Sequence, residues 1–203
     1  MGRLLLTHSL LAAWIYALKE NPYEDMTSET DKLAEFMATL RREPTPTTEA
    51  MQNGIQFEDE ITAIMRGDGD TGSPWYGAEV RIANILRGAR LQVRAQKEIT
   101  FCGLPFLLYG RLDALRSGVI YDTKFSKSYE RGKYFDSTQH PVYLELVPEA
   151  KEFTYLVSNG AEVWTETYRR DETPSIYPII ADFVGWLKNN KLFDLYAEKW
   201  TSK

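Results

Sequence analysis

The chain has few of the residues on which several common kinds of site depend. Its 203 residues include one cysteine, Cys102, and two histidines. One cysteine excludes an internal disulfide and any four-cysteine zinc or iron–sulfur cluster, and it agrees with a protein of the reducing cytoplasm. No apolar run approaches the roughly 20 residues of a membrane-spanning helix, so we expect a soluble protein without a membrane partner. The run from Leu4 to Tyr16 is shorter and no small-residue cleavage site follows it, which favours an ordinary helix.

Positive charge is also scarce over the whole chain. There are 24 Lys and Arg against 29 Asp and Glu, a net charge of -5, which argues against a nucleic-acid partner. The distribution is uneven, however. Residues 81–133 hold 11 Lys and Arg against 4 Asp and Glu, so this strip carries +7 and the remainder -12. Phosphate contacts depend on local charge, so the sequence still allows one basic surface that binds nucleic acid. The alternative is that these bases are scattered over both faces of a sheet and solvated.

Apolar periodicity and capping residues predict a mixed chain with its sheet in the middle. The expected helices span about 8–20, 29–42, 48–65 and 75–88, another begins near Asp136 or Ser137, and about 174–200 is helical. The expected strands span about 91–101, 105–116, 118–125, 152–158 and 162–168. The 43% apolar content is ample for the core of one domain. The sequence therefore predicts a single α/β (α+β) domain.

The stretch Ile120-Tyr121-Asp122-Thr123-Lys124 is the most informative one. Side chains alternate faces along a strand, so Asp122 and Lys124 project from the same side. A hairpin through Ser117-Gly118 would bring Asp113 of the preceding strand beside Asp122. Two adjacent carboxylates repel unless a cation lies between them, and Mg²⁺ prefers one or two carboxylates with waters and phosphate oxygens. The pattern predicts a divalent metal site with Lys124 beside it.

The alternative interpretation is an exposed charge pair on a surface strand, which is common and nearly neutral in energy. The neighbouring apolar residues instead indicate a strand buried on both faces: Val119, Ile120, Tyr121 and Phe125. Burying Asp or Lys without compensation costs several kcal/mol. Glu149-Ala150-Lys151 has the same spacing, but it follows Val147-Pro148 at an expected turn, where no strand aligns its side chains. Context therefore favours Asp122 and Lys124 as the site.

Asp113, Asp122 and Lys124 together resemble the motif of the PD-(D/E)XK nuclease superfamily, which is an acidic residue, a variable gap, then Asp or Glu, any residue, and Lys. Three further segments resemble the RecB-like and phage exonuclease branch of that superfamily. They are Glu58 four residues after Gly54 on an expected helix, the Gln139 and Tyr143 pair after the lysine strand, and the opening from Thr7 to Tyr16. Together these matches run from about residue 7 to about residue 160.

The resemblance implies a restriction-endonuclease-like core, with a central mixed sheet flanked by helices and with helical additions at both ends. It divides the single domain 1–203 into a helical N-terminal part at 1–45, a nuclease core at 48–168 and C-terminal helices at 172–203. It also implies a metal-dependent deoxyribonuclease, of the exonuclease type, acting in recombination, repair or phage and defence DNA processing. The cofactor would be Mg²⁺ or Mn²⁺, without an iron–sulfur cluster, because Cys102 is alone.

By the same resemblance, Lys124, Asp113, Asp122 and Glu58 are catalytic. The metal would be held by Asp113, Asp122, Glu58 and the main-chain carbonyl of Thr123. Glu60 is the rival to Glu58, because a small change in helix phase exchanges their directions. Lys124 would position the attacking water or stabilise negative charge on the phosphate.

The substrate is expected to be bound by Gln139, Tyr143, Lys127 and Arg131. Gln139 and Tyr143 are one helical turn apart and share a face. Pro141 lies between them, and it is tolerated only in the first turn of its helix.

Two other functions remain open at this point. One is a nuclease-fold subunit that binds DNA or assembles with a partner and has weak or partner-dependent activity. The other is a hydrolase of sugars that uses Asp113 and Asp122 as acid and base and needs no metal. DNA is the expected partner, and a homo-oligomer or a helicase or recombinase partner is left open. End or internal cutting, strand polarity and preference for single- or double-stranded nucleic acid are open too.

Overall fold

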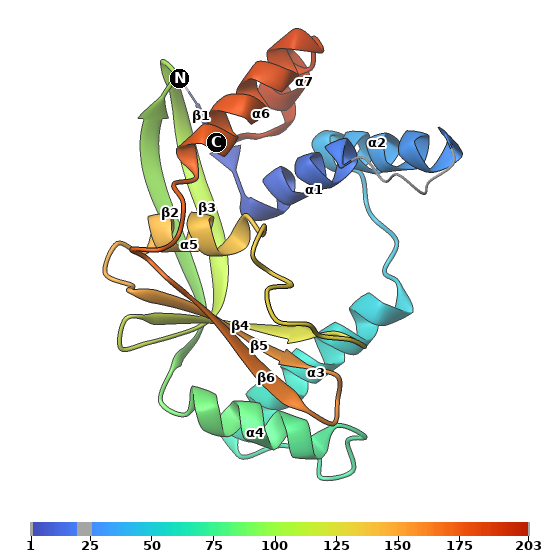
Figure 1. Ribbon diagram of the computed structural model, residues 1–203, viewed down its shortest axis with the longest axis vertical. Helices are drawn as coiled ribbons and strands as arrows, with labels where there is room; N and C mark the ends of the chain where they lie inside the picture. The colour runs from blue at the N-terminus through green and yellow to red at the C-terminus, as the bar shows by residue number, and fades with distance from the viewer. Residues whose placement is uncertain (1, 20–25, 203) are drawn as a thin grey trace.

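The computed structural model describes residues 2–19 and 26–202, and the side chains of residues 26–31 are not described. Its helices are α1 (His8–Leu18), α2 (Met26–Arg41), α3 (Glu49–Arg66), α4 (Tyr76–Leu86), α5 (Gln139–Leu146), α6 (Tyr177–Asn189) and α7 (Phe193–Lys199). Its strands are β1 (Arg3–Leu6), β2 (Arg90–Phe101), β3 (Leu104–Arg116), β4 (Val119–Phe125), β5 (Glu152–Ser158), β6 (Val163–Arg169) and β7 (Thr201–Ser202). The fold is a mixed sheet flanked by helices, which confirms the predicted α+β class (Figure 1).

The sheet has the strand order β6-β5-β4-β3-β1-β7, and β2 also pairs with β3. The strands β2, β3 and β4 are antiparallel, while β5 lies parallel to β4 after the α5 crossover. Since β2 accompanies β3 along almost its whole length, β1 and β4 share the opposite edge of β3. On that edge β1 pairs at residues 106–108 and β4 at residues 114–116. The sheet therefore divides between these two places, and α5 lies beside the division.

The first strand is a correction to the sequence analysis. The apolar run Leu4–Tyr16 is helical only from His8, because the preceding residues form β1 and pair with β3. Thr7 separates the two elements and caps the helix, accepting a hydrogen bond at 3.2 Å from the backbone N–H of Leu10. These four residues lie between β3 and β7 and bury Leu4 and Leu6, and this tertiary contact outweighs local periodicity.

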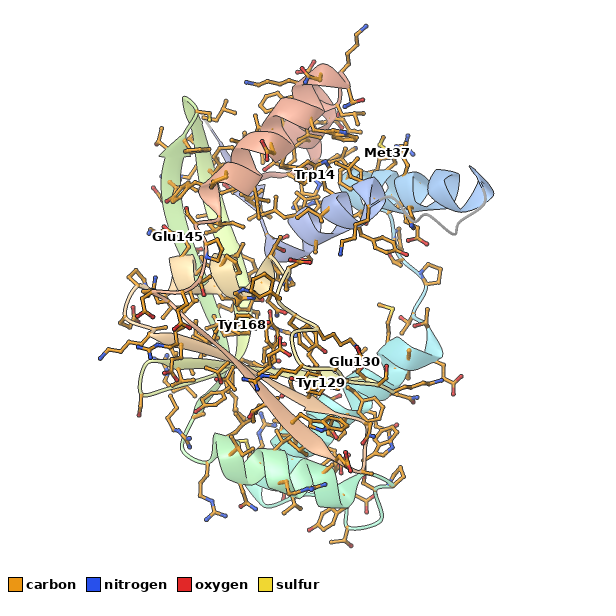
Figure 2. The ribbon with its side chains drawn as sticks, in the orientation of Figure 1. Trp14, Met37, Tyr129, Glu130, Glu145 and Tyr168 are labelled. Carbon is orange, nitrogen blue, oxygen red and sulfur yellow. The ribbon has the colours of Figure 1, made fainter. Side chains whose placement is uncertain are left out.

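The N-terminal and C-terminal helices pack against each other. The ring of Trp14 lies 5.4 Å from Phe183 and 6.4 Å from Trp186, and Phe36 lies 5.5 Å from Trp186. The indole N–H of Trp200 donates to the carbonyl of Leu40 at 2.8 Å. Figure 1 shows these helices gathered at one end of the β2–β3 hairpin, and Figure 2 labels Trp14 and Met37 there.

The helices α3 and α4 lie at the other end of the molecule, against β4 and its neighbours (Figure 1). Thr48 caps the start of α3, and Gly67, in the left-handed conformation, ends it. This helix carries Glu58 toward the sheet. No helix among residues 2–19 and 26–202 combines the length and apolar character needed to cross a bilayer.

Candidate functional site

The two hairpins that contain β3 both lose their regular pairing at Asp113. The β3–β4 turn places Ser117 and Gly118 at φ of 51° and 78°, as a tight two-residue hairpin turn requires. Its register pairs Arg116 with Val119 and ends at Ala114 and Tyr121. The next pair in that register would be Asp113 with Asp122, so the predicted hairpin brings them together. There the Asp113 Oδ2 atom accepts a hydrogen bond from the backbone N–H of Thr123 at 2.8 Å.

The β2–β3 hairpin has one unpaired position, and it also faces Asp113. Leu91 pairs with Ala114 and Val93 with Leu112, which leaves Gln92 out of the ladder. Gln92 has φ of 51°, a conformation that side-chain-bearing residues seldom adopt within a strand. Strained backbone of this kind concentrates at functional sites. The main chain is thus distorted on both sides of this aspartate.

Asp122 and Lys124 form an ion pair on one face of β4. Their side chains meet with Nζ and Oδ2 2.7 Å apart. Asp122 is 3% exposed, so the prediction of a buried acid is confirmed. Its Oδ1 atom accepts a hydrogen bond from Nε2 of Gln139. Oδ2 has the ammonium group close by but accepts no well-aligned hydrogen bond, so charge rather than directed bonding holds that contact.

The site carries more negative than positive charge. Burial raises the pKa of Asp113, and the nearby charges of Asp122 and Glu58 raise it further. Burial also raises the pKa of Asp122, although Lys124 and the hydrogen bond from Gln139 oppose this. Burial alone would lower the pKa of Lys124, but the surrounding carboxylates outweigh it and the pKa is raised. Lys124 is therefore a charged ammonium group at neutral pH, and several acids compete for it.

The structure separates Glu58 from its rival. Burial, followed by the charge of Asp122, raises the pKa of Glu58, while Lys124 and Arg111 lower it. Glu58 therefore faces the site from α3. Glu60 points elsewhere, because its Oε1 atom accepts a hydrogen bond from the backbone N–H of Asp70.

The predicted ligand set of three carboxylates is not assembled in this arrangement. Across the described ranges, no three histidine, cysteine, aspartate or glutamate side chains are grouped so as to hold a metal ion. The reason is that the carboxylates already have hydrogen-bond donors or cations as partners. Lys124 and Gln139 contact Asp122, and the Thr123 N–H donates to Asp113. The pair of aspartates still fits a hard divalent cation. Both carboxylates are desolvated with raised pKa values, and Oδ2 of Asp122 lacks an aligned donor.

Gln139 and Tyr143 lie behind the carboxylates rather than on the surface. Pro141 is the third residue of α5, within the first turn as required. Gln139 and Tyr143 are each 4% exposed. Gln139 donates to Asp122, and the Tyr143 hydroxyl donates to the carbonyl of Arg111 at 3.0 Å. The structure thus corrects their expected role: both position groups of the site, and their buried polar atoms leave little for a substrate to contact.

The other two expected substrate contacts, Lys127 and Arg131, are exposed on the loop between β4 and α5. The bases of the central strip do not all face solvent freely. Arg81 donates to the carbonyl of Ala161, and Lys97 pairs with Glu145 at 2.6 Å. The prediction of one basic face therefore stays a prediction.

Three residues near the site were given no role from the sequence. The partly buried ring of His8 lies edge-on to Tyr143 at 5.4 Å, and desolvation together with the charge of Lys124 lowers its pKa to about 4. The charge of Arg111 lowers the pKa of Glu58, and the carboxylate of Glu166 binds the backbone of the β4–α5 loop. Glu166 lies between Thr165 and Thr167, and a polar run of this kind is ordinary for an edge strand, so the sequence gives no signal for its role.

No protein-family model matches the chain, and no curated protein matches it either. Among solved structures, the chain is similar to the one described as "Crystal structure of SSO0001". The TM-score is 0.53 at 15% sequence identity, and the match covers 92% of this chain and 78% of the other. At this identity the similarity shows a shared fold and nothing further.

Proposed function

We propose that the chain is a Mg²⁺- or Mn²⁺-dependent deoxyribonuclease that hydrolyses phosphodiester bonds of DNA. One observation carries the proposal: the partly buried Asp113 and the buried Asp122 lie side by side on adjacent strands, with Lys124 on the same face at 2.7 Å from Asp122. Such an excess of desolvated acid is costly, and it persists where function requires it. The strand order and the crossover helix agree with the resemblance to PD-(D/E)XK nucleases.

A divalent ion held by Asp113 and Asp122, with the Thr123 carbonyl and Glu58 beside them, would activate water and neutralise charge on the phosphate. The protein's own groups prepare this arrangement. Gln139 fixes one oxygen of Asp122, and the Thr123 N–H fixes one oxygen of Asp113. The ammonium group of Lys124 is a hydrogen-bond donor for an attacking water or a phosphate oxygen.

Exposed basic residues near the site would contact the phosphates of the DNA. Lys127 and Arg131 lie on the loop that follows Lys124. A groove of about 490 Å³ beside Glu58 is lined by Gln92, Arg111 and Arg66. Arginine forks suit phosphate oxygens, and the Tyr143 hydroxyl holds the backbone of Arg111 in place.

A second candidate is a nuclease-fold subunit that binds DNA or assembles with a partner and cleaves weakly or only in complex. The observation that favours it is the ion pair of Lys124 and Asp122, together with carboxylates that, among the described residues, are not grouped in threes around a common point.

The decisive experiment incubates the purified chain with end-labelled linear and circular DNA, single- and double-stranded, in Mn²⁺, Mg²⁺ or a chelator. We expect metal-dependent cleavage that Lys124→Ala and Asp122→Asn each reduce at least about 100-fold. Lys151→Ala is the matched control, because Glu149 and Lys151 have the same spacing but are exposed in the connection between α5 and β5. Binding without cleavage would support the subunit. Cleavage of sugars that a chelator does not affect would support the sugar hydrolase.

A further inference from the structure

Phe135 is the most exposed of the large hydrophobic side chains in the described part of the chain, at 71%. It lies in the loop, residues 126–138, that joins the strand of Lys124 to the helix of Gln139. An exposed apolar residue at a loop tip is unremarkable where the loop is loosely held. This loop is held firmly, so its exposed aromatic ring needs an explanation.

Glu166 on β6 fastens the loop from beneath. The residue is only 7% exposed, and its carboxylate accepts hydrogen bonds from three loop groups. These are the Tyr129 hydroxyl at 2.8 Å and the backbone N–H groups of Gly132 at 3.2 Å and Tyr134 at 3.1 Å. The hydroxyl of Tyr168, also on β6, donates to the same carboxylate. Figure 2 labels Tyr129 and Glu130 on this loop and Tyr168 near them, in the middle of the molecule.

The backbone on both sides of Phe135 is fixed as well. Its N–H donates to the carbonyl of Gly132 at 3.0 Å, and the N–H of Ser137 donates to the carbonyl of Tyr134 at 3.0 Å. Gly132 has φ of 87°, which only glycine adopts freely. The ring of Tyr134 stacks on Tyr155 with centroids 4.4 Å apart. The chain thus holds Phe135 outward through a defined series of turns.

The loop borders the candidate site. Burial and then the charge of Asp122 raise the pKa of Tyr134 to about 12, so the residue before Phe135 lies within reach of the buried carboxylate. Tyr155, on which Tyr134 stacks, is also the strand partner of Asp122. Phe135 is therefore one residue removed from a side chain that faces the site, and it projects to the solvent side.

Aromatic and basic residues border a hollow beside the loop of Phe135. The hollow, of about 230 Å³, lies between α1 and the loop and is lined by Tyr16, Lys19, Lys133 and Asp136, the residue after Phe135. Tyr16 is 52% exposed and Lys19 is exposed beside it, whereas Lys32, whose ammonium group lies 5.4 Å from the centre of the Tyr16 ring, is itself buried. Exposed aromatic rings set among lysines and arginines are typical of surfaces that bind single-stranded nucleic acid, where bases stack on the rings and phosphates contact the cations.

We propose that Phe135 is a stacking contact for an unpaired base of single-stranded DNA, on a rigid loop that delivers the strand to Asp113, Asp122 and Lys124, with Tyr16 and the neighbouring lysines extending the path. The proposal rests on the proposed nuclease function for one point, which is that the bound DNA leads to the candidate site. Stacking alone is independent of cleavage.

The test measures binding of a single-stranded oligonucleotide that contains 2-aminopurine, in a chelator so that no cleavage occurs. Stacking on Phe135 is expected to change the 2-aminopurine emission on binding. Phe135→Ala should remove that change and weaken binding roughly 10-fold, while Phe135→Trp should retain both. Leu33→Ala is the matched control, because Leu33 is also an exposed apolar residue but lies on α2. It should bind like the wild type.

Three outcomes overturn the stacking proposal: unchanged emission and affinity in Phe135→Ala, an equal loss in Leu33→Ala, or an equal loss for a blunt duplex. The result is separable from the fate of the proposed function. If the emission change depends on Phe135 but Mn²⁺ supports no cleavage, the stacking contact stands and the nuclease proposal fails. If cleavage is normal while Phe135→Ala binds single strands like the wild type, the nuclease proposal stands and the stacking contact fails.

Discussion

At the scale of single residues, the charge of Asp122 depends on two partners from different parts of the chain. Lys124 balances the charge across 2.7 Å, and Gln139 donates to the other oxygen. Removing one partner of a buried pair leaves an uncompensated charge, which costs more than the pair itself contributes. The carboxylate escapes part of that cost by taking up a proton, since burial already raises its pKa.

Lys124→Met is therefore expected to lower the free energy of unfolding at neutral pH by about 2 kcal/mol. The double variant Asp122→Asn/Lys124→Met should recover most of this loss, because the Asp122 carboxylate is removed together with its partner. Urea denaturation of the wild type and of both variants measures the difference. Equal stability of Lys124→Met and the wild type would show that Asp122 does not need its ammonium partner.

His140 is expected to make the free energy of unfolding depend on pH. Its buried ring stacks on Tyr168 at 4.0 Å, and burial lowers its pKa to about 4, against a weaker opposing effect of Glu166. A histidine with a lowered folded-state pKa contributes stability that is present above about pH 6.5 and is lost as the pH falls toward 4.

Between pH 7 and pH 4.5 this loss amounts to about 2 kcal/mol from His140. His140→Phe keeps an aromatic ring in the stack and removes the titrating group. We expect the variant to lose about 2 kcal/mol less than the wild type over this interval, as measured by urea denaturation at both pH values. Parallel pH profiles for the two proteins would contradict the assignment.

At the scale of elements, the candidate site depends on how closely α5 approaches β3. Gly110 makes this approach possible, because a Cβ atom there would lie 2.5 Å from Cε1 of Tyr143 and 2.9 Å from Cδ1 of Leu146. The same contact brings the Tyr143 hydroxyl to the Arg111 carbonyl, where the sheet divides.

Gly110→Ala is expected to lower the free energy of unfolding by about 1–3 kcal/mol, since α5 must move to admit the methyl group. Gly54→Ala, within α3, is the matched control. It has open space around the Cβ position and should stabilise the protein by about 0.5–1 kcal/mol through helix propensity. Thermal unfolding of both variants tests the pair, and destabilisation of equal size would refute the packing argument.

Most elements could be predicted from the sequence, and the two that could not be are informative. The strands β2 to β6 and the helices α1 to α5 lie close to their predicted ranges, because alternation, capping residues and turn glycines act locally. The predicted helical segment 174–200 forms two helices, α6 and α7. The short strands β1 and β7 were missed. They pair with each other, and β1 pairs with a strand about 100 residues away, so nothing in their own sequence marks them.

At the scale of the whole molecule, metal binding should be measurable as stability, independently of any cleavage. An ion that binds only the folded state raises the free energy of unfolding in proportion to the logarithm of its concentration. Millimolar Mn²⁺ is expected to raise the unfolding temperature of the wild type by a few degrees, and Asp113→Asn should abolish this increase.

Asp59→Asn is the control for this measurement, since Asp59 is an exposed acid next to Glu58 on α3. It should respond to Mn²⁺ like the wild type. An identical response in all three proteins would place the ion elsewhere, and no response in any of them would count against the metal centre.

Sequence alone determined that Asp122 and Lys124 share a face, that a hairpin returns Asp113 to them, and that Gln139 and Tyr143 stand one turn apart. Strand alternation, turn chemistry and helical period act over a few residues, so local sequence suffices for each. Only the tertiary structure decided that Glu58 rather than Glu60 faces the aspartates, that Gln139 and Tyr143 are used internally, and that Glu166 anchors the loop of Phe135. Those outcomes depend on how the helices pack against the sheet. Contacts between segments far apart in the chain produce no periodic pattern in the sequence.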